Sequence, residues 1–284
     1  MGEGNMKYLY IKFFVGALLL LAMNLSYAAD PIVPYETREA WVEYTSDLDN
    51  LQIPALLIAP KKTGDYPAVL YIHGRFGLSN EIIEQLRVLA KQGIAILAPD
   101  YYFARAIPKL PSFNDSDTVV DVESAVPFFE SILSQVTTSK NKKIAILAQD
   151  HGAYHALLIS THRAQDISAI MGISPLMQDP NAPKPKQIYQ YLPEIDQVKT
   201  PTLLLIGGAD REMRRINVGR AADRMRQLKN RVVHIEYPGA HRCFDWRAES
   251  ASLADTMARK DSIAQMVSFL KEYSGGEDLL VLAQ

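Results

Sequence analysis

The chain has 284 residues, of which 48% are hydrophobic and 22% are charged. This composition is typical of a globular domain, and the length suffices for one large core, so a single domain is expected. Lys and Arg number 30 against 32 Asp and Glu, which gives a formal net charge of −2. The balance excludes a chain-wide basic field for nucleic acid or anionic lipid and favours a small-molecule or peptide partner.

The first 28 residues have the pattern of a secretory signal peptide. Lys7 and Lys12 precede the apolar run Phe13–Met23, and the small residues Ser26 and Ala28 lie just before a cleavage point. The uncharged run is short for a bilayer span of about 20 residues, and no stop-transfer pattern follows it. We therefore expect residues 1–28 to be removed. Residues 29–284 should form one exported domain, periplasmic or secreted, with no membrane anchor.

The single cysteine, Cys243, excludes an intramolecular disulfide bond. Exported proteins often contain disulfide bonds, but none can form within this chain, so its stability must come from its hydrophobic core. A lone cysteine is more often a small buried hydrophobic residue than a nucleophile.

From residue 39 onward, apolar runs typical of strands alternate with helical patterns, which predicts a mostly parallel sheet with helices on both faces. Eight strands are expected, over Trp41–Tyr44, Ile53–Ile58, Ala68–Ile72, Ile94–Leu97, Lys143–Leu147, Ala169–Ile173, Thr202–Ile206 and Val232–Glu236. Amphipathic spacing predicts helices over Asn80–Lys91, Val119–Gln135, Ala153–His162, Asn217–Leu228 and Ser252–Tyr273. The first strands have no helix between them and should pair antiparallel.

Two proline-rich stretches, Ile107–Pro111 and Pro175–Pro185, fall between regular elements and should be surface loops. In an open α/β sheet, the loops at the carboxyl ends of the strands build the site. Only about 25 residues separate Pro175 from Pro201, which is too short for an independent helical cap domain. The sequence therefore predicts no large cap.

Five segments in fixed order resemble the dienelactone hydrolase family of the α/β-hydrolase fold. They are Tyr66–Leu78 with its HGRFGL loop, Gly93–Phe103 with APDYYF, Leu147–Gly152, Pro201–Asp210 and Tyr237–Trp246. Five ordered landmarks are far more specific than one motif. The resemblance covers about residues 36 to 272, and it implies a hydrolase that opens small esters or lactones through an acyl-enzyme, with a Cys-Asp-His triad and no cofactor.

The nucleophile of such a fold stands on a tight turn between a strand and a helix, flanked by small residues. Ala148–Gly152 fits that turn, because a buried strand precedes it and a helix pattern follows it. Asp150 thus occupies the place where the family has cysteine. The resemblance also implies an oxyanion hole from the backbone N–H groups of Arg75 and His151, and it places Gly74 where the family has an activating glutamate.

An aspartate at this turn changes the chemistry. A carboxylate that attacks an ester forms a mixed anhydride that collapses back, whereas it can displace halide from carbon or open an epoxide. Gln149–Gly152 resembles the turns of haloalkane dehalogenases and epoxide hydrolases. His151 stands where the dehalogenases have a halide-binding Trp. The two Tyr donors of epoxide hydrolases come from a cap domain that this chain lacks, and Tyr189 and Tyr191 are the candidates to replace them.

The residue that faces Asp150 depends on the register of the Tyr237–Trp246 loop. The family pattern aligns Arg242 with the catalytic histidine, and His241 stands one residue earlier. If the loop shifts, Asp150, Asp210 and His241 form an Asp-Asp-His triad, in which Asp210 orients the imidazole. If it does not shift, Arg242 pairs with Asp150, and this pair cannot transfer a proton because arginine stays protonated.

Three functions remain open on this sequence: a diverged dienelactone hydrolase-like enzyme, an Asp-nucleophile dehalogenase or epoxide hydrolase, and a catalytically inactive binding protein. No ligand spacing supports a metal site at Asp150, Asp210 and His241. A run of arginines follows Asp210 and is interpreted as a solvated helix face. Its members are Arg211, Arg214, Arg215, Arg220, Arg224 and Arg226. For each of the three functions, the expected partner is a small molecule.

Overall fold

The computed structural model describes residues 33–109, 116–178, 191–246 and 252–280. The chain divides into two units, residues 1–33 and 34–284, and the fold below is that of the second unit. The predicted signal peptide, Tyr189 and much of the second proline-rich stretch lie outside the described residues. No helix in the described ranges is long and apolar enough to cross a membrane.

Eight strands form one mixed sheet, as predicted, in the order β1-β2-β4-β3-β5-β6-β7-β8. β1 and β2 pair antiparallel, β2 pairs antiparallel with β4, and the remaining neighbours are parallel. Most central strands are buried on both sides, which explains their near-continuous apolar runs. The strands are β1 Thr37–Thr45, β2 Gln52–Pro60, β3 Ala68–Ile72, β4 Ala95–Pro99, β5 Ile144–Gln149, β6 Ile167–Ile173, β7 Thr202–Gly207 and β8 Val232–Tyr237.

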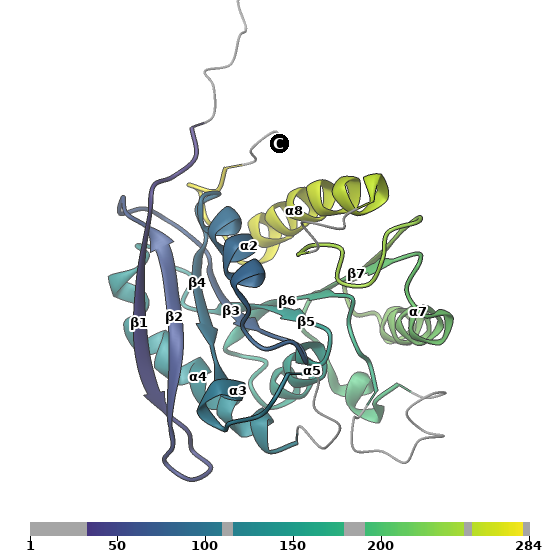
Figure 1. The fold of residues 1–284 in the computed structure, drawn as a ribbon, viewed down its shortest axis with the longest axis horizontal. Helices are drawn as coiled ribbons and strands as arrows, with labels where there is room; N and C mark the ends of the chain where they lie inside the picture. Colours follow the sequence, from purple (N-terminus) through teal and green to yellow (C-terminus); the bar gives the residue numbers. More distant parts are fainter. Residues whose placement is uncertain (1–32, 110–115, 179–190, 247–251, 281–284) are drawn as a thin grey trace, which may run out of the picture. The chain divides into compact units, whose positions relative to one another are not determined.

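Helices cover both faces of this sheet, and Figure 1 shows α2 and α8 near one another on the same side. The helices are α2 Asn80–Ala90, α3 Tyr101–Ala104, α4 Ser116–Ile132, α5 Gly152–His162, α7 Glu212–Gln227 and α8 Leu253–Tyr273, with short 3₁₀ turns at Leu133–Gln135 and Pro193–Gln197. One apolar cluster joins α4, α5 and α7 to the sheet, and a second joins α2 and α8 to its other face. The α/β-hydrolase fold is thereby confirmed.

Alternation along β3 shows how one strand serves both layers. Leu70 and Ile72 belong to the α4/α5/α7 layer, whereas Val69 and Tyr71 belong to the α2/α8 layer. All four side chains are at most 3% exposed. The strand therefore has no solvent face, and its carboxyl end leads directly into the HGRFGL loop.

The largest differences from the sequence prediction are the starts of two elements and one short helix. β1 begins at Thr37, four residues before the predicted Trp41, because Thr37–Ala40 pair with β2 although most of them are exposed. α7 begins at Glu212 and not at Asn217, since its first turn carries arginines that hide the apolar periodicity. The four-residue helix α3 was not predicted. Asp100 is its N-cap, since the Asp100 carboxylate accepts a hydrogen bond from the backbone N–H of Phe103 at 3.2 Å.

Candidate functional site

Asp150 lies on the sharp turn between β5 and α5, as the sequence predicts. Its φ is +50°, a left-handed conformation that is costly for a residue with a side chain. The turn is held because the backbone N–H of Asp150 donates to Ile173 O at 3.1 Å. Gly152 lets α5 approach β3, since a Cβ there would lie 2.4 Å from Ile72 O. The backbone thus has the geometry of a nucleophile elbow.

Two further residues in left-handed conformations lie against the elbow. Ser174 follows β6 with φ +47°, and Cys243 follows β8 with φ +53°. They are joined directly, because the backbone N–H of Cys243 donates to Ser174 Oγ at 2.8 Å. Backbone strain of this kind persists where surrounding contacts over-determine it, and it gathers at functional sites. The segments that follow β5, β6 and β8 therefore each contain a left-handed residue, and these residues lie close together.

Three guanidinium groups surround the Asp150 carboxylate. Arg214 Nη1 donates to Oδ1 at 2.9 Å, and Arg75 Nε donates to Oδ2 at 3.3 Å. Arg242 Nη2 makes a third, short contact with Oδ1. The side chain of Asp150 is 1% exposed, against 7% for Arg214, 18% for Arg242 and 26% for Arg75. The carboxylate of Asp150 is therefore buried, whereas Arg75 and Arg242 are partly exposed.

Charge sets the protonation state of this cluster. Burial alone would raise the pKa of Asp150, but the neighbouring Arg214 and Arg242 outweigh burial and hold that pKa well below its usual range. Burial opposes the charge of Arg242 as well, yet the carboxylate of Asp150 raises the Arg242 pKa above its ordinary value. Asp150 is thus an anion and Arg242 a cation at every physiological pH, and neither can exchange a proton.

Asp210 orients an arginine and not a histidine. Its Oδ1 accepts from the backbone N–H of Arg211 at 2.7 Å, and its Oδ2 lies 3.5 Å from Arg214 Nε. Arg214 also donates to Ser174 O at 3.1 Å. The interpretation of the whole arginine run as a solvated face was therefore wrong for Arg214, which is 7% exposed. The i, i+4 spacing of Asp210 and Arg214 is the sequence signal that could have found it.

His241 points away from the elbow. Its Nδ1 lies 2.9 Å from Asp255 Oδ2, its backbone N–H donates to Asp255 Oδ1 at 2.6 Å, and its side chain is 49% exposed. The contact between Asp150 and His241 that an Asp-Asp-His triad requires is not formed. Of the two loop residues, Arg242 contacts Asp150 and His241 contacts Asp255, and the catalytic roles of Asp150, Asp210, His241 and Arg242 stay a prediction.

The loop after β3 closes over the elbow. A Cβ at Gly74 would lie 2.6 Å from Asp150 Cβ, so a glutamate could not stand there without displacing the turn. The next residue is Arg75, and a turn bond from Gly77 N to Gly74 O at 3.1 Å holds the loop. The oxyanion-hole roles of the backbone N–H groups of Arg75 and His151 stay a prediction, because no reacting oxygen is present to define them.

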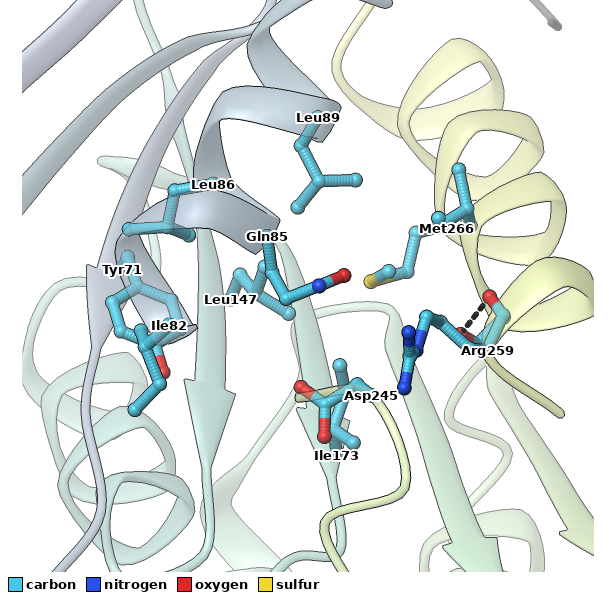
Figure 2. A pocket seen from close by; sticks show the side chains of 12 residues that line it. Tyr71, Ile82, Gln85, Leu86, Leu89, Leu147, Ile173, Asp245, Arg259 and Met266 are labelled. Atoms are coloured by element: carbon cyan, nitrogen blue, oxygen red, sulfur yellow. Dashed lines mark hydrogen bonds between the residues drawn. The ribbon is translucent and has the colours of Figure 1, made fainter. Parts of the chain in front are cut away.

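A hydrogen-bonded chain runs from the elbow to the α2/α8 layer. Tyr71 Oη donates to Gln149 Oε1 at 3.2 Å, and Gln149 Nε2 donates to Asp245 Oδ2 at 2.8 Å. Asp245 is partly exposed as a residue, but its carboxyl group is buried, and burial raises its pKa to about 6. Figure 2 shows this carboxyl and Arg259 in a small cavity of about 20 Å³ between α2 and α8.

Two other candidate residues pack inside the protein: Cys243 is buried, and Tyr191 is partly buried. Burial raises the pKa of the Cys243 thiol to about 12, so it is inert as a nucleophile at neutral pH. Tyr191 packs against the core cluster of the α4/α5/α7 layer. Within the described residues, no three His, Cys, Asp or Glu side chains are grouped so as to hold a metal ion.

Comparison with known proteins gives a consistent result. The family model described as "Dienelactone hydrolase family" matches residues 53–274. Proteins named "Putative carboxymethylenebutenolidase" are 25% identical over 246 residues in Escherichia coli strain K12, covering 81% of this chain and 86% of that one, and 28% identical over 215 residues in Yersinia pestis, covering 70% and 79%. An esterase structure from Pyrobaculum calidifontis aligns with a TM-score of 0.66 and 16% identity, covering 94% and 93%.

Titration of Asp245 should be visible in the stability of the protein. Its pKa is raised in the folded state, so the folded protein binds the proton more tightly and loses stability as pH rises from about 4 to about 6. Asp245→Asn keeps an acceptor for Gln149 and removes the titration. We expect urea unfolding of the wild type to weaken relative to this variant by up to about 3 kcal/mol across that window. Parallel pH profiles for the two proteins would contradict the assignment.

Proposed function

We propose that this chain, which belongs to the dienelactone hydrolase family, binds a small carboxylate-bearing molecule at its elbow without forming an acyl-enzyme. The observation that carries the proposal is the partner of Asp150. Arg242 contacts the carboxylate, whereas the His241 imidazole is held by Asp255. On this proposal, an aspartate and an arginine stand in place of the nucleophile and base of a family hydrolase.

Both replacements work against ester hydrolysis. Attack by the Asp150 carboxylate would form a mixed anhydride, and carboxylate is a better leaving group than most alkoxides, so the adduct returns to the ester. A general base must have a pKa near the working pH, and the guanidinium of Arg242 is protonated throughout. The ion pairs to Arg75 and Arg214 further reduce the nucleophilicity of Asp150.

The charge of the cluster favours an anionic ligand. Three guanidinium groups face the two carboxylates of Asp150 and Asp210, which leaves one positive charge in excess. Arg75 and Arg242 are the partly exposed members, and guanidinium groups bind planar carboxylates through paired hydrogen bonds. The bacterial relatives are named for a carboxymethylene-substituted butenolide, a small lactone with such a group. A carboxylate-bearing lactone or its ring-opened acid therefore fits this site.

Slow hydrolysis of a small activated ester is a second candidate. It is favoured by one observation, that the backbone of the elbow retains the strained geometry of a nucleophile turn. A water molecule would have to attack without help from Asp150 or His241. The two candidates differ in one measurement, because only hydrolysis gives turnover.

Restoring the missing groups should restore hydrolysis. Asp150→Cys supplies a thiol, and Arg242→His supplies a base beside it. Asp210 lies close enough to position 242 to raise the pKa of the arginine that stands there. We expect the double variant to hydrolyse p-nitrophenyl acetate about a hundredfold faster than either single variant, because one group without the other lacks either nucleophile or base.

The wild type serves as the control in the same assay, with the uncatalysed rate subtracted. The proposal predicts no turnover of esters or lactones above that background. Turnover above background would contradict it. Turnover that survives Asp150→Ala would support the second candidate, whereas turnover that Asp150→Ala removes would assign a catalytic role to Asp150.

Binding is tested separately from turnover. We expect a carboxymethylene-substituted butenolide to bind the wild type in calorimetry about tenfold more tightly than its methyl ester, which lacks the charge. Arg75→Gln should remove that difference. Arg220→Gln on the exposed side of α7 is the matched control and should leave it unchanged. Equal binding of acid and ester by the wild type would refute the anion site.

We further propose that the protein is exported and that its mature form starts at Ala29 or Asp30. The proposal rests on the basic and apolar pattern of residues 1–28. Mass spectrometry of periplasmic or secreted protein should give an N-terminal peptide that begins at one of these residues. A membrane-bound form that retains Lys7 would contradict cleavage.

A further inference from the structure

A second cavity lies at the β1 side of the sheet, independent of the elbow chemistry. It has a volume of about 630 Å³, within the usual range of small-ligand pockets. We call it the Trp41 groove, and it is lined by Trp41, Val42, Glu43, Pro54, Asp100 and Phe103. Its walls come from β1, the start of β2 and the segment that follows β4, so the groove depends on the folded sheet.

Two aromatic rings of the groove are left open to solvent. Trp41 is 58% exposed and Phe103 is 76% exposed, although both side chains are large and apolar. They come from parts of the chain about sixty residues apart that the fold brings to one cavity. Exposed aromatic side chains that gather at a concave surface mark a binding site more often than a solvated one.

The polar groups of the groove are both acidic. Glu43 is exposed on β1, and Asp100 follows β4 with its side chain 19% exposed. No lysine or arginine is among the lining residues. Asp100 already has partners inside the protein, because its Oδ1 lies 4.0 Å from His73 Nε2 and accepts the backbone N–H of Phe103 at 3.2 Å. Glu43 is therefore the more exposed of the two carboxylates and the one more open to a ligand.

The geometry points to the Trp41 groove as a binding site for a small organic cation, a free alkylammonium compound. Its ammonium group would lie over the rings of Trp41 and Phe103, where the negative face of each ring attracts a cation. Glu43 and Asp100 would supply the opposite charge. A neutral apolar ligand would cover the carboxylate of Glu43 without supplying a counter-charge, and for that reason it fits the groove less well.

Pairing of a second copy along β1 is the main competing use of this surface. β1 is an edge strand of the sheet, so its outer hydrogen-bonding groups are available. It carries Arg38, Glu39 and Glu43, and Glu39 is already paired with Arg87 at 2.7 Å, so charge alone does not exclude a second copy. The acidic lining of the groove itself favours a cationic small molecule as its occupant.

Saturation-transfer NMR on the full-length or processed protein tests the site with choline as the probe. The neutral isostere 3,3-dimethylbutan-1-ol has the same shape without the charge. We expect saturable transfer to the choline methyl groups with a dissociation constant in the millimolar range, and little transfer to the alcohol at equal concentration.

Variants locate the site. Glu43→Gln and Phe103→Ala should each weaken choline binding by about threefold to fivefold. Glu36→Gln, whose exposed partner is Lys61 on the same side of the sheet, is the matched control and should change binding by less than about twofold. Circular dichroism melting curves show whether each variant is folded.

Three outcomes would overturn the inference. They are the absence of saturable transfer to choline, equal transfer to choline and the alcohol, and choline binding that neither groove variant weakens. Sedimentation at the NMR concentration separates the competing use, since transfer that appears only when the protein dimerises would assign this face to a second copy.

Discussion

The ionised carboxylate of Asp150 has to be neutralised inside the protein, and the arrangement of the site follows from that requirement. Burial of an unpaired carboxylate costs several kcal/mol, so partners must come from the surrounding chain. Arg75 follows β3, Arg214 lies on α7 and Arg242 follows β8. Ion pairs from three segments thus connect the elbow after β5 to the neighbouring strand β3 and to α7 and the edge strand β8.

A second carboxylate explains why histidine does not join this cluster. Asp255 completes the capping box of α8 with Ser252, and the same carboxylate accepts the backbone and ring N–H groups of His241. Turning His241 toward Asp150 would break these bonds and displace Arg242. A hydrogen bond to a charged group contributes about 1.5 to 3 kcal/mol, and the Arg242 ion pair adds to it. Helix α8 therefore also fixes the register of the loop beside the elbow.

Much of the fold could be predicted from the sequence, because buried parallel strands are nearly continuous apolar runs and the elbow needs small residues on both sides. The position of Asp150 followed from the same patterns. Arg214 was missed, since its buried role depends on tertiary partners at Asp150 and Ser174 and a run of arginines is usually solvated. The choice between His241 and Arg242 depended on one residue of register, which no local pattern determines.

The formal net charge of −2 conceals two local fields of opposite sign. The elbow has an excess of one positive charge among buried and partly exposed side chains, whereas the Trp41 groove has only acidic polar groups. The backbone constraints at the elbow are of another kind, because Gly74, Gly152 and the left-handed turn at Asp150 depend on steric fit and not on charge. The shape of such a turn is therefore compatible with different charges around it, and the shape alone does not report activity.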